Sequence, residues 1–218
     1  MAAVDSKEIA DVAAYLKLRI IASALNEGWQ PEFTENEYRW YPWFYLYTQE
    51  EIDNMTQEEK DKAYLKMAQQ WATNSYAIRL NVGCLIVKND QIISDGFNGT
   101  PSGMPNVCEY AYDDITDTSI NVTTIDELHD QELAGLRLMT HPYVLHAESN
   151  ALAKCAKNGV PVTGATLYVT DEPCMECAKL IIQCGIKRVV YARSYRLHQG
   201  LELLRQCNID VEHIAMNY

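Results

Sequence analysis

The sequence predicts an α/β domain in which a central mixed sheet of five strands carries helices on both faces. From residue 61 onward, helix-like and strand-like patterns alternate along the chain. The first two strand-like segments follow each other directly, whereas helices separate the later three, which predicts both antiparallel and parallel neighbours in one sheet. Hydrophobic residues make up 48% of the 218 residues, which is enough for a core of this kind.

The first 60 residues differ in composition from the rest of the chain. They hold 12 acidic and 5 basic residues, and 10 of the 21 aromatic residues, most of them within 40–47. Apolar residues at helical spacing between Ile9 and Leu25 predict an amphipathic helix that ends near Gly28. We therefore expect residues 1–60 to be an acidic, aromatic-rich extension that packs on the main domain, residues 61–218, or on a neighbouring subunit.

The main domain is expected to begin with a helix and a hairpin. Residues 63–72 repeat apolar side chains at helical spacing. Residues 82–87 and 92–94 read as two strands, and Asn89-Asp90 between them is typical of a tight hairpin turn.

The second half of the main domain alternates helices with strands. The predicted helices are residues 146–158, 174–184 and 199–207. The predicted strands are residues 166–170, 188–192 and 210–214. Gly159 and Gly185 follow the first two helices, where glycine favours the left-handed conformation that ends a helix. Residues 109–140 interrupt the alternation, and 109–132 hold eight acidic and no basic residues. We expect a solvated acidic insertion that is partly helical over 125–139.

Charge and hydropathy exclude several classes of partner. The formal net charge of −12 argues against nonspecific binding to nucleic acid or to an anionic membrane surface. The apolar runs are too short to span a bilayer, and no secretory signal precedes the domain, so we expect a cytoplasmic protein. Seven cysteines without an export signal favour reduced thiols over disulfides. Outside the two acidic segments the net charge is +3, which is consistent with a phosphorylated small molecule as ligand.

Two short motifs carry the chemistry. They are His146-Ala147-Glu148 and Pro173-Cys174-Met175-Glu176-Cys177. One imidazole and two thiolates suit tetrahedral Zn²⁺, and three protein ligands leave a fourth position for water. Cys174 and Cys177 are three residues apart at the start of a predicted helix, where both thiols can face one point and the helix N-terminus favours thiolates. Glu148 follows His146 by two residues, so it is expected beside the metal as a general acid and base rather than as a ligand.

Residues 63–214, apart from the insertion, resemble the cytidine deaminase superfamily and, within it, the deoxycytidylate deaminases. His-x-Glu followed by Pro-Cys-x-x-Cys is typical of zinc nucleobase deaminases. The Gly-Phe-Asn-Gly-Thr-Pro loop at 96–101 and the Tyr-Arg pair at 195–196 favour the deoxycytidylate branch. The resemblance implies the three-layer deaminase fold and zinc-dependent hydrolysis of dCMP to dUMP and ammonia, which supplies dUMP for dTMP synthesis. It also implies that His146, Cys174 and Cys177 hold one catalytic Zn²⁺ and that Glu148 moves the protons.

The same resemblance assigns substrate contacts to six further residues. They are Asn98 for the deoxyribose, Ala147 and Thr170 for the base, and Ser75, Tyr195 and Arg196 for the 5'-phosphate. Asn74 stands where many members of the family carry an arginine, so the phosphate contacts differ from the usual set.

Regulation and assembly are also implied by the resemblance. Members of this branch bind dCTP as activator and dTTP as inhibitor, with Mg²⁺, and form homo-oligomers, commonly hexamers. An effector site is expected at the loop that holds Gly96, Gly99, Pro101 and Gly103, since glycine lets backbone N–H groups approach a phosphate. The alternative is that the loop serves only to hold Asn98.

Three alternatives stay open at this point. Cys108, His129 and His141 form a candidate second metal site, although their spacing is irregular. A tRNA adenosine deaminase shares the His-Ala-Glu and Glu-Pro-Cys-x-x-Cys motifs, but the acidic composition and the loop at 96–101 count against it. A partner-binding protein on a relic zinc fold would use the aromatic extension, but it would have no need of Glu148.

Overall fold

The structure, a computed structural model, describes residues 55–122, 124, 127, 136–194 and 198–216. The chain divides into two compact units, Met1–Met67 and Ala68–Tyr218, and the division falls inside helix α3 (Gln57–Ala72). The helix expected to end near Gly28 and the aromatic run 40–47 lie outside the described residues. The boundary near residue 60 and the docking of the extension therefore stay predictions.

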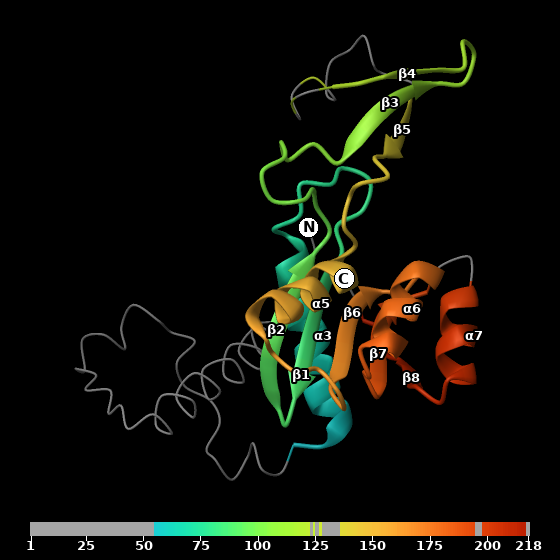
Figure 1. Cartoon of the computed structure of the whole chain (residues 1–218). Coiled ribbons are helices and arrows are strands. Elements are labelled where there is room, and N and C mark those ends of the chain that lie inside the picture. Colours follow the sequence, from blue (N-terminus) through green and yellow to red (C-terminus); the bar gives the residue numbers. More distant parts are fainter. Residues whose placement is uncertain (1–54, 123, 125–126, 128–135, 195–197, 217–218) are drawn as a thin grey trace, which may run out of the picture. The chain divides into compact units, whose positions relative to one another are not determined.

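A five-stranded sheet forms the centre of the second unit (Figure 1). In spatial order its strands are β2 (Gln91–Phe97), β1 (Gly83–Lys88), β6 (Thr166–Asp171), β7 (Arg188–Arg193) and β8 (Asp210–His213). β1 pairs antiparallel with both β2 and β6, whereas β6, β7 and β8 run parallel. The predicted mixed sheet of five strands is thus confirmed.

Local sequence explains where these elements turn and end. Asn89 and Asp90 have φ angles of 51° and 56°, so the β1–β2 hairpin uses the mirror-image turn whose twist matches the strands. Gly159, with φ 67°, donates its N–H to the last turn of helix α5 (Ala147–Asn158). Gly185, with φ 76°, follows helix α6 (Met175–Gln183) in the same left-handed region. Both predicted helix ends are confirmed.

Helices cover both faces of the sheet. α5, α6 and α7 (Gln199–Gln206) share one apolar core with β1, β6 and β7. Neighbouring residues on a strand point to opposite faces. Cys84 belongs to that core, whereas a Cβ atom at the preceding Gly83 would lie 1.9 Å from Ala68 O of α3. The last turns of α3 therefore cover the other face, and only glycine allows this approach. None of the described helices has the combination of length and apolar character that crossing a membrane requires.

The insertion is a small sheet, which corrects the expectation of a partly helical segment. Strand β3 (Glu109–Asp113) lies between β4 (Thr118–Ile120) and β5 (Arg137–Thr140), and both pairings are antiparallel. Residues 137–139, expected to be helical, belong to β5, while most of 125–135 lies outside the described residues. The partners in the β3–β5 ladder are more than 20 residues apart, so local periodicity does not reveal them. Figure 1 shows this sheet beyond one end of the main strands.

Candidate active site

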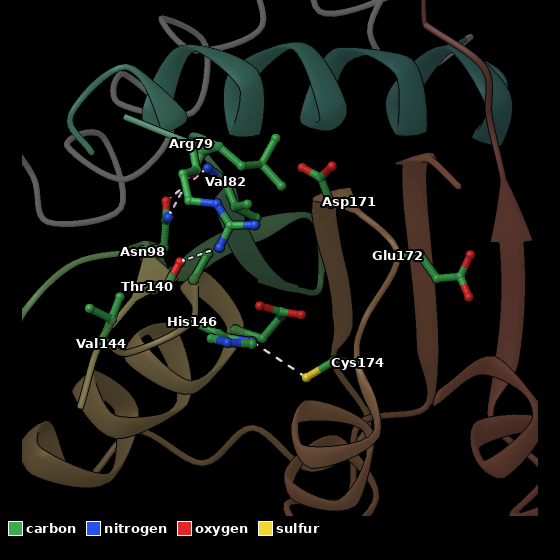
Figure 2. A pocket seen from close by; sticks show the side chains of 12 residues that line it. Arg79, Val82, Asn98, Thr140, Val144, His146, Asp171, Glu172 and Cys174 are labelled. Atoms are coloured by element: carbon green, nitrogen blue, oxygen red, sulfur yellow. Dashed lines mark hydrogen bonds between the residues drawn. The ribbon is translucent and has the colours of Figure 1, made fainter. Parts of the chain in front are cut away.

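The two motifs meet at the N-termini of two helices. His146 is the N-cap of α5 and Cys174 the N-cap of α6, and Cys177 lies in the first turn of α6. His146 Nδ1 lies 3.4 Å from Cys174 Sγ (Figure 2). The same nitrogen lies 3.5 Å from Cys177 Sγ. Zinc bonds of about 2.0–2.1 Å to nitrogen and 2.3 Å to sulfur, at a tetrahedral angle, separate the two atoms by about 3.6 Å. The three side chains therefore fit a tetrahedral zinc ion, and their ligand atoms all lie within 4.8 Å of one another.

The pKa values of the two cysteine thiols are shifted in opposite directions. The hydrogen bond from the Cys177 thiol, supported by His146, lowers the pKa of Cys174 to about 3. The same hydrogen bond raises the pKa of Cys177, because Cys177 is its donor. Zinc takes cysteine as thiolate, so binding of the ion releases the proton of Cys177.

Glu148 lies in the first turn of α5 and is almost completely buried, with 4% of its surface exposed. Burial, partly opposed by a hydrogen bond to its own backbone, raises the pKa of this carboxyl to about 7. A carboxyl group with such a pKa is able both to accept and to donate a proton near neutral pH. The structure thus places a group suited to proton transfer on the same helix turn as His146.

Helix α7 packs against the turn that carries Cys174. Gly200 packs so closely on this turn that a Cβ atom there would lie 2.1 Å from Pro173 O. The side chain of Glu172 is fully buried and lies 2.9 Å from Nδ1 of His198. The N–H of Glu172 donates to Arg193 O at 2.9 Å. The position of Cys174 therefore depends on β7 and α7 as well as on its own helix.

A cavity of about 440 Å³ opens beside these groups (Figure 2). Its volume lies within the range of about 300–1,000 Å³ that is usual for small-molecule sites. His146, Glu148 and Cys174 line one part of it, and Arg79 and Thr140 line another. The reacting groups are thus accessible to a ligand of nucleotide size.

Some of the expected substrate-binding residues line the cavity and others do not. Asn98 and Ala147 line the cavity, whereas Ser75 and Thr170 are absent from its described lining. Ser75 Oγ donates to Asn98 O at 2.8 Å, and Thr170 Oγ1 donates to Asp171 Oδ2 at 2.7 Å, so both hydroxyls have partners in the fold. Tyr195 and Arg196 lie outside the described residues.

Asn98 holds the backbone of the neighbouring segment. Its Oδ1 accepts from the N–H of Val82, and its Nδ2 donates to Leu80 O, both at 2.8 Å. An amide side chain has two acceptor lone pairs and two donor hydrogens, so one of each is left for a ligand. Contact with a deoxyribose is therefore compatible with the bonds that Asn98 already makes.

The loop that holds the expected effector residues has a packing role. Gly96 allows α5 to approach β2, since a Cβ atom there would lie 2.1 Å from Ala147 O. Gly99 forms a backbone bridge with Leu145. Gly96, Gly99, Pro101 and Gly103 are not in the described lining of the cavity, so an effector site at this loop stays a prediction.

The candidate second metal site receives no support from its described members. The N–H of His141 donates to Cys108 O, which brings the two residues together, and His129 lies outside the described residues. Burial raises the pKa of the Cys108 thiol to about 11, which disfavours the thiolate that a metal needs. In the described part of the chain, the only cluster of three potential ligands is that of His146, Cys174 and Cys177.

Sequence reasoning missed Arg79 and Thr140. Arg79 lies in the irregular segment before β1, and Thr140 ends the insertion. No motif or spacing connects a loop arginine and an inserted threonine to a metal site more than 60 residues away from Arg79 in the chain. The hydrogen bond from Arg79 Nη1 to Thr140 Oγ1, at 3.1 Å, becomes evident only in the folded chain.

A three-ligand metal site beside a buried carboxyl, at the edge of a mixed sheet covered by helices, fits a zinc-dependent hydrolytic enzyme. The family model described as "Cytidine and deoxycytidylate deaminase zinc-binding region" matches residues 58–193, more than half of the chain. The chain belongs to this family.

Relatives and solved structures agree with that assignment. The chain is 34% identical over 171 residues to deoxycytidylate deaminase of Enterobacteria phage T4, covering 70% of this chain and 88% of the phage protein. It is also 34% identical over 148 residues to ComE operon protein 2 of Bacillus subtilis, and there the match covers 67% of this chain and 66% of the Bacillus protein. The crystal structure of dCMP deaminase from cyanophage S-TIM5 with dCMP and dUMP superposes with a TM-score of 0.56. That match has 35% identity and covers 74% of this chain and the whole of the cyanophage chain.

Proposed function

We propose that the chain hydrolyses dCMP to dUMP and ammonia. The observation that carries the proposal is the placement of Glu148 beside the His146, Cys174 and Cys177 cluster at an open cavity. Two further findings support it: deoxycytidylate deaminases are among the relatives, and the similar cyanophage structure contains dCMP and dUMP.

His146, Cys174 and Cys177 would hold the zinc ion. When bound, the ion supplies positive charge that lowers the pKa of a water molecule and so provides a nucleophile near neutral pH. Glu148 accepts a proton from the attacking water and delivers it to N3 of cytosine, while the oxygen adds to C4. Glu148 then transfers the second proton of the water to the exocyclic amino group, which leaves as ammonia as the C4–N bond breaks. Water and cytosine are thereby converted to uracil and ammonia.

The surroundings of Glu148 suit this cycle. In the metal-free protein burial raises its pKa to about 7, so a proton on this carboxyl is less strongly disfavoured than on an exposed glutamate. Ala147 and Asn98 line the same cavity and are proposed to contact the base and the deoxyribose. Regulation by dCTP and dTTP with Mg²⁺, and a hexameric assembly, are further proposals that rest on the resemblance to the family.

A product assay with the full-length, zinc-loaded protein tests the proposal. The protein is incubated with dCMP, dCTP, deoxycytidine and an adenosine-containing RNA stem-loop, and uracil and inosine products are separated by chromatography. We expect dUMP to form from dCMP at the highest kcat/KM. Inosine in the RNA without dUMP would instead identify a tRNA adenosine deaminase, and no product from any substrate would favour a partner-binding protein. Glu148→Gln is the matched control for contaminating deaminase activity.

A further inference from the structure

We propose that Arg79 binds the 5'-phosphate of the nucleotide and that the inserted sheet holds it in position for this. The inference rests on the proposed function, since it names the residue that would distinguish a nucleotide from a nucleoside at the same site. It also gives the insertion a role in the active site beyond that of a solvated loop.

The charges around the cavity single out Arg79. Among the described residues that line the cavity, it is the only arginine or lysine. Two acidic residues on the wall already have cationic or hydrogen-bonding partners. Asp171 accepts from Arg193 at 2.6 Å, and Glu172 lies 2.9 Å from His198. Among the described arginine and lysine side chains of the lining, only Arg79 therefore offers a dianionic phosphate a permanent positive charge.

The guanidinium of Arg79 is available for an anion. In the described part of the chain, its side chain donates one hydrogen bond, to the neutral hydroxyl of Thr140 at 3.1 Å, and forms no ion pair. A guanidinium has five N–H donors in a fixed plane, so donors remain for two phosphate oxygens. Figure 2 shows the Arg79 side chain reaching Thr140, with its guanidinium to the right of Asn98 and Thr140 and above His146.

The backbone that carries Arg79 is held from two directions. Asn98 bonds to Leu80 O and to the N–H of Val82, on one side of Arg79. The buried carboxylate of Glu109 accepts from the N–H groups of Ile78 and Arg79, at 3.2 and 3.4 Å. An exposed arginine is usually mobile, and fixing its backbone reduces the conformational entropy that binding costs.

One cross-strand pair of the inserted sheet holds both the backbone and the side chain of Arg79. Glu109 of β3 and Thr140 of β5 are direct partners in the antiparallel ladder. Glu109 binds the backbone of Arg79, and Thr140 binds its side chain. The sheet thereby fixes the backbone of Arg79 and the direction of its guanidinium together. Thr140 itself is a positioning residue, because it acts on the phosphate through Arg79.

Steady-state kinetics on dCMP and deoxycytidine test the inference. Arg79→Ala should raise KM for dCMP about 10- to 150-fold, the range for losing one charge-assisted hydrogen bond, and should change KM for deoxycytidine less than twofold. Arg79→Lys should recover part of the loss, since it keeps the charge but not the planar donor pair. Thr140→Val should raise KM for dCMP severalfold, and by more than it raises KM for deoxycytidine. Arg205→Ala, at an exposed arginine of α7, is the matched control and should behave as the parent.

Calorimetric binding of product gives a second readout that does not depend on turnover. In Arg79→Ala, affinity for dUMP should fall by the same factor as KM rises, while affinity for deoxyuridine stays at the parent value. Equal losses on nucleotide and nucleoside would show that Arg79 is structural and overturn the inference. Unchanged dCMP kinetics in Arg79→Ala, with a large effect in Arg196→Ala, would assign the phosphate to the other arginine and also overturn it. A parent protein that deaminates deoxycytidine but never prefers dCMP would refute the proposed function itself.

Discussion

Replacing Gly200 by alanine should weaken zinc binding, because the added Cβ atom would meet the backbone of Pro173 and Cys174. A Cβ atom at this position would lie 2.1 Å from Pro173 O and 3.0 Å from the carbonyl carbon of Cys174. An ordinary contact is 3.4 Å or more, so the gap between α7 and the metal-binding turn has to open by at least about 1.3 Å. Both partners are backbone, so no change of side-chain rotamer can relieve the overlap.

The energetic cost follows from this overlap. Overpacking of this kind costs about 1–3 kcal/mol. Alanine is favoured over glycine within a helix by about 0.5–1 kcal/mol, which offsets part of the loss. A net loss of about 1–2 kcal/mol should lower the melting temperature by about 2–8 °C. Displacement of Cys174 should lower zinc affinity about 10- to 100-fold, as changes next to metal ligands do.

Two measurements check this prediction: thermal unfolding by circular dichroism, and zinc affinity by competition with a chromogenic chelator. Gln206→Ala, at an exposed position of the same helix, is the control and should match the parent in both. If Gly200→Ala binds zinc with the parent affinity and melts at the parent temperature, the close packing of α7 on the metal-binding turn does not determine the site.

Three further predictions concern the reacting groups themselves. Glu148→Gln should keep its zinc and its fold but lose about 10²–10⁴-fold in kcat, because the amide cannot shuttle protons; parent activity in this variant would remove Glu148 from the mechanism. Cys177→Ser should lose zinc, measured by atomic absorption, and a full zinc content would show that the metal has other ligands. In metal-free protein, burial raises the pKa of Glu148 from 4.5 to about 7, so the folded state binds the extra proton between these values. The free energy of unfolding should therefore fall as pH rises from 4.5 to 7, by about 3 kcal/mol, and Glu148→Gln should abolish that part of the slope; an unchanged slope in denaturant titrations of the variant would contradict the burial argument.

The inserted sheet changes how the active site is understood. Its acidic composition predicts a solvated segment, and the exposure of β4 agrees with that. Glu109, however, is buried and binds backbone N–H groups beside the cavity, and Thr140 lines the cavity itself. Substitutions in this sheet should therefore affect substrate binding as well as stability.

The metal centre and the main sheet could be predicted from the sequence because their signals are local. His146 and Glu148 share one helix turn, and Cys174 and Cys177 share another, so spacing alone indicates the ligands and the proton carrier. The spacing of apolar residues and the turn residues indicate the strands, and Gly159 and Gly185, which have positive φ, mark two helix ends. These features depend on residues within one or two turns of each other, and their physics does not require the rest of the fold.

The wall of the cavity opposite the metal was decided by tertiary structure. Arg79 and Thr140 line this wall, and Glu109 holds the backbone of Arg79. These three residues come from separate stretches of the chain, and only the packing of β3, β5 and the segment before β1 brings them together. Gly200 is similar, since its contact with Pro173 joins two helices that local patterns treat as independent. Hydrogen bonds and close contacts between distant segments produce no repeating residue pattern along the chain, so the sequence does not reveal them. The sequence therefore predicts the metal ligands and Glu148, and only the folded structure adds Arg79 and Thr140 to the residues that line the cavity.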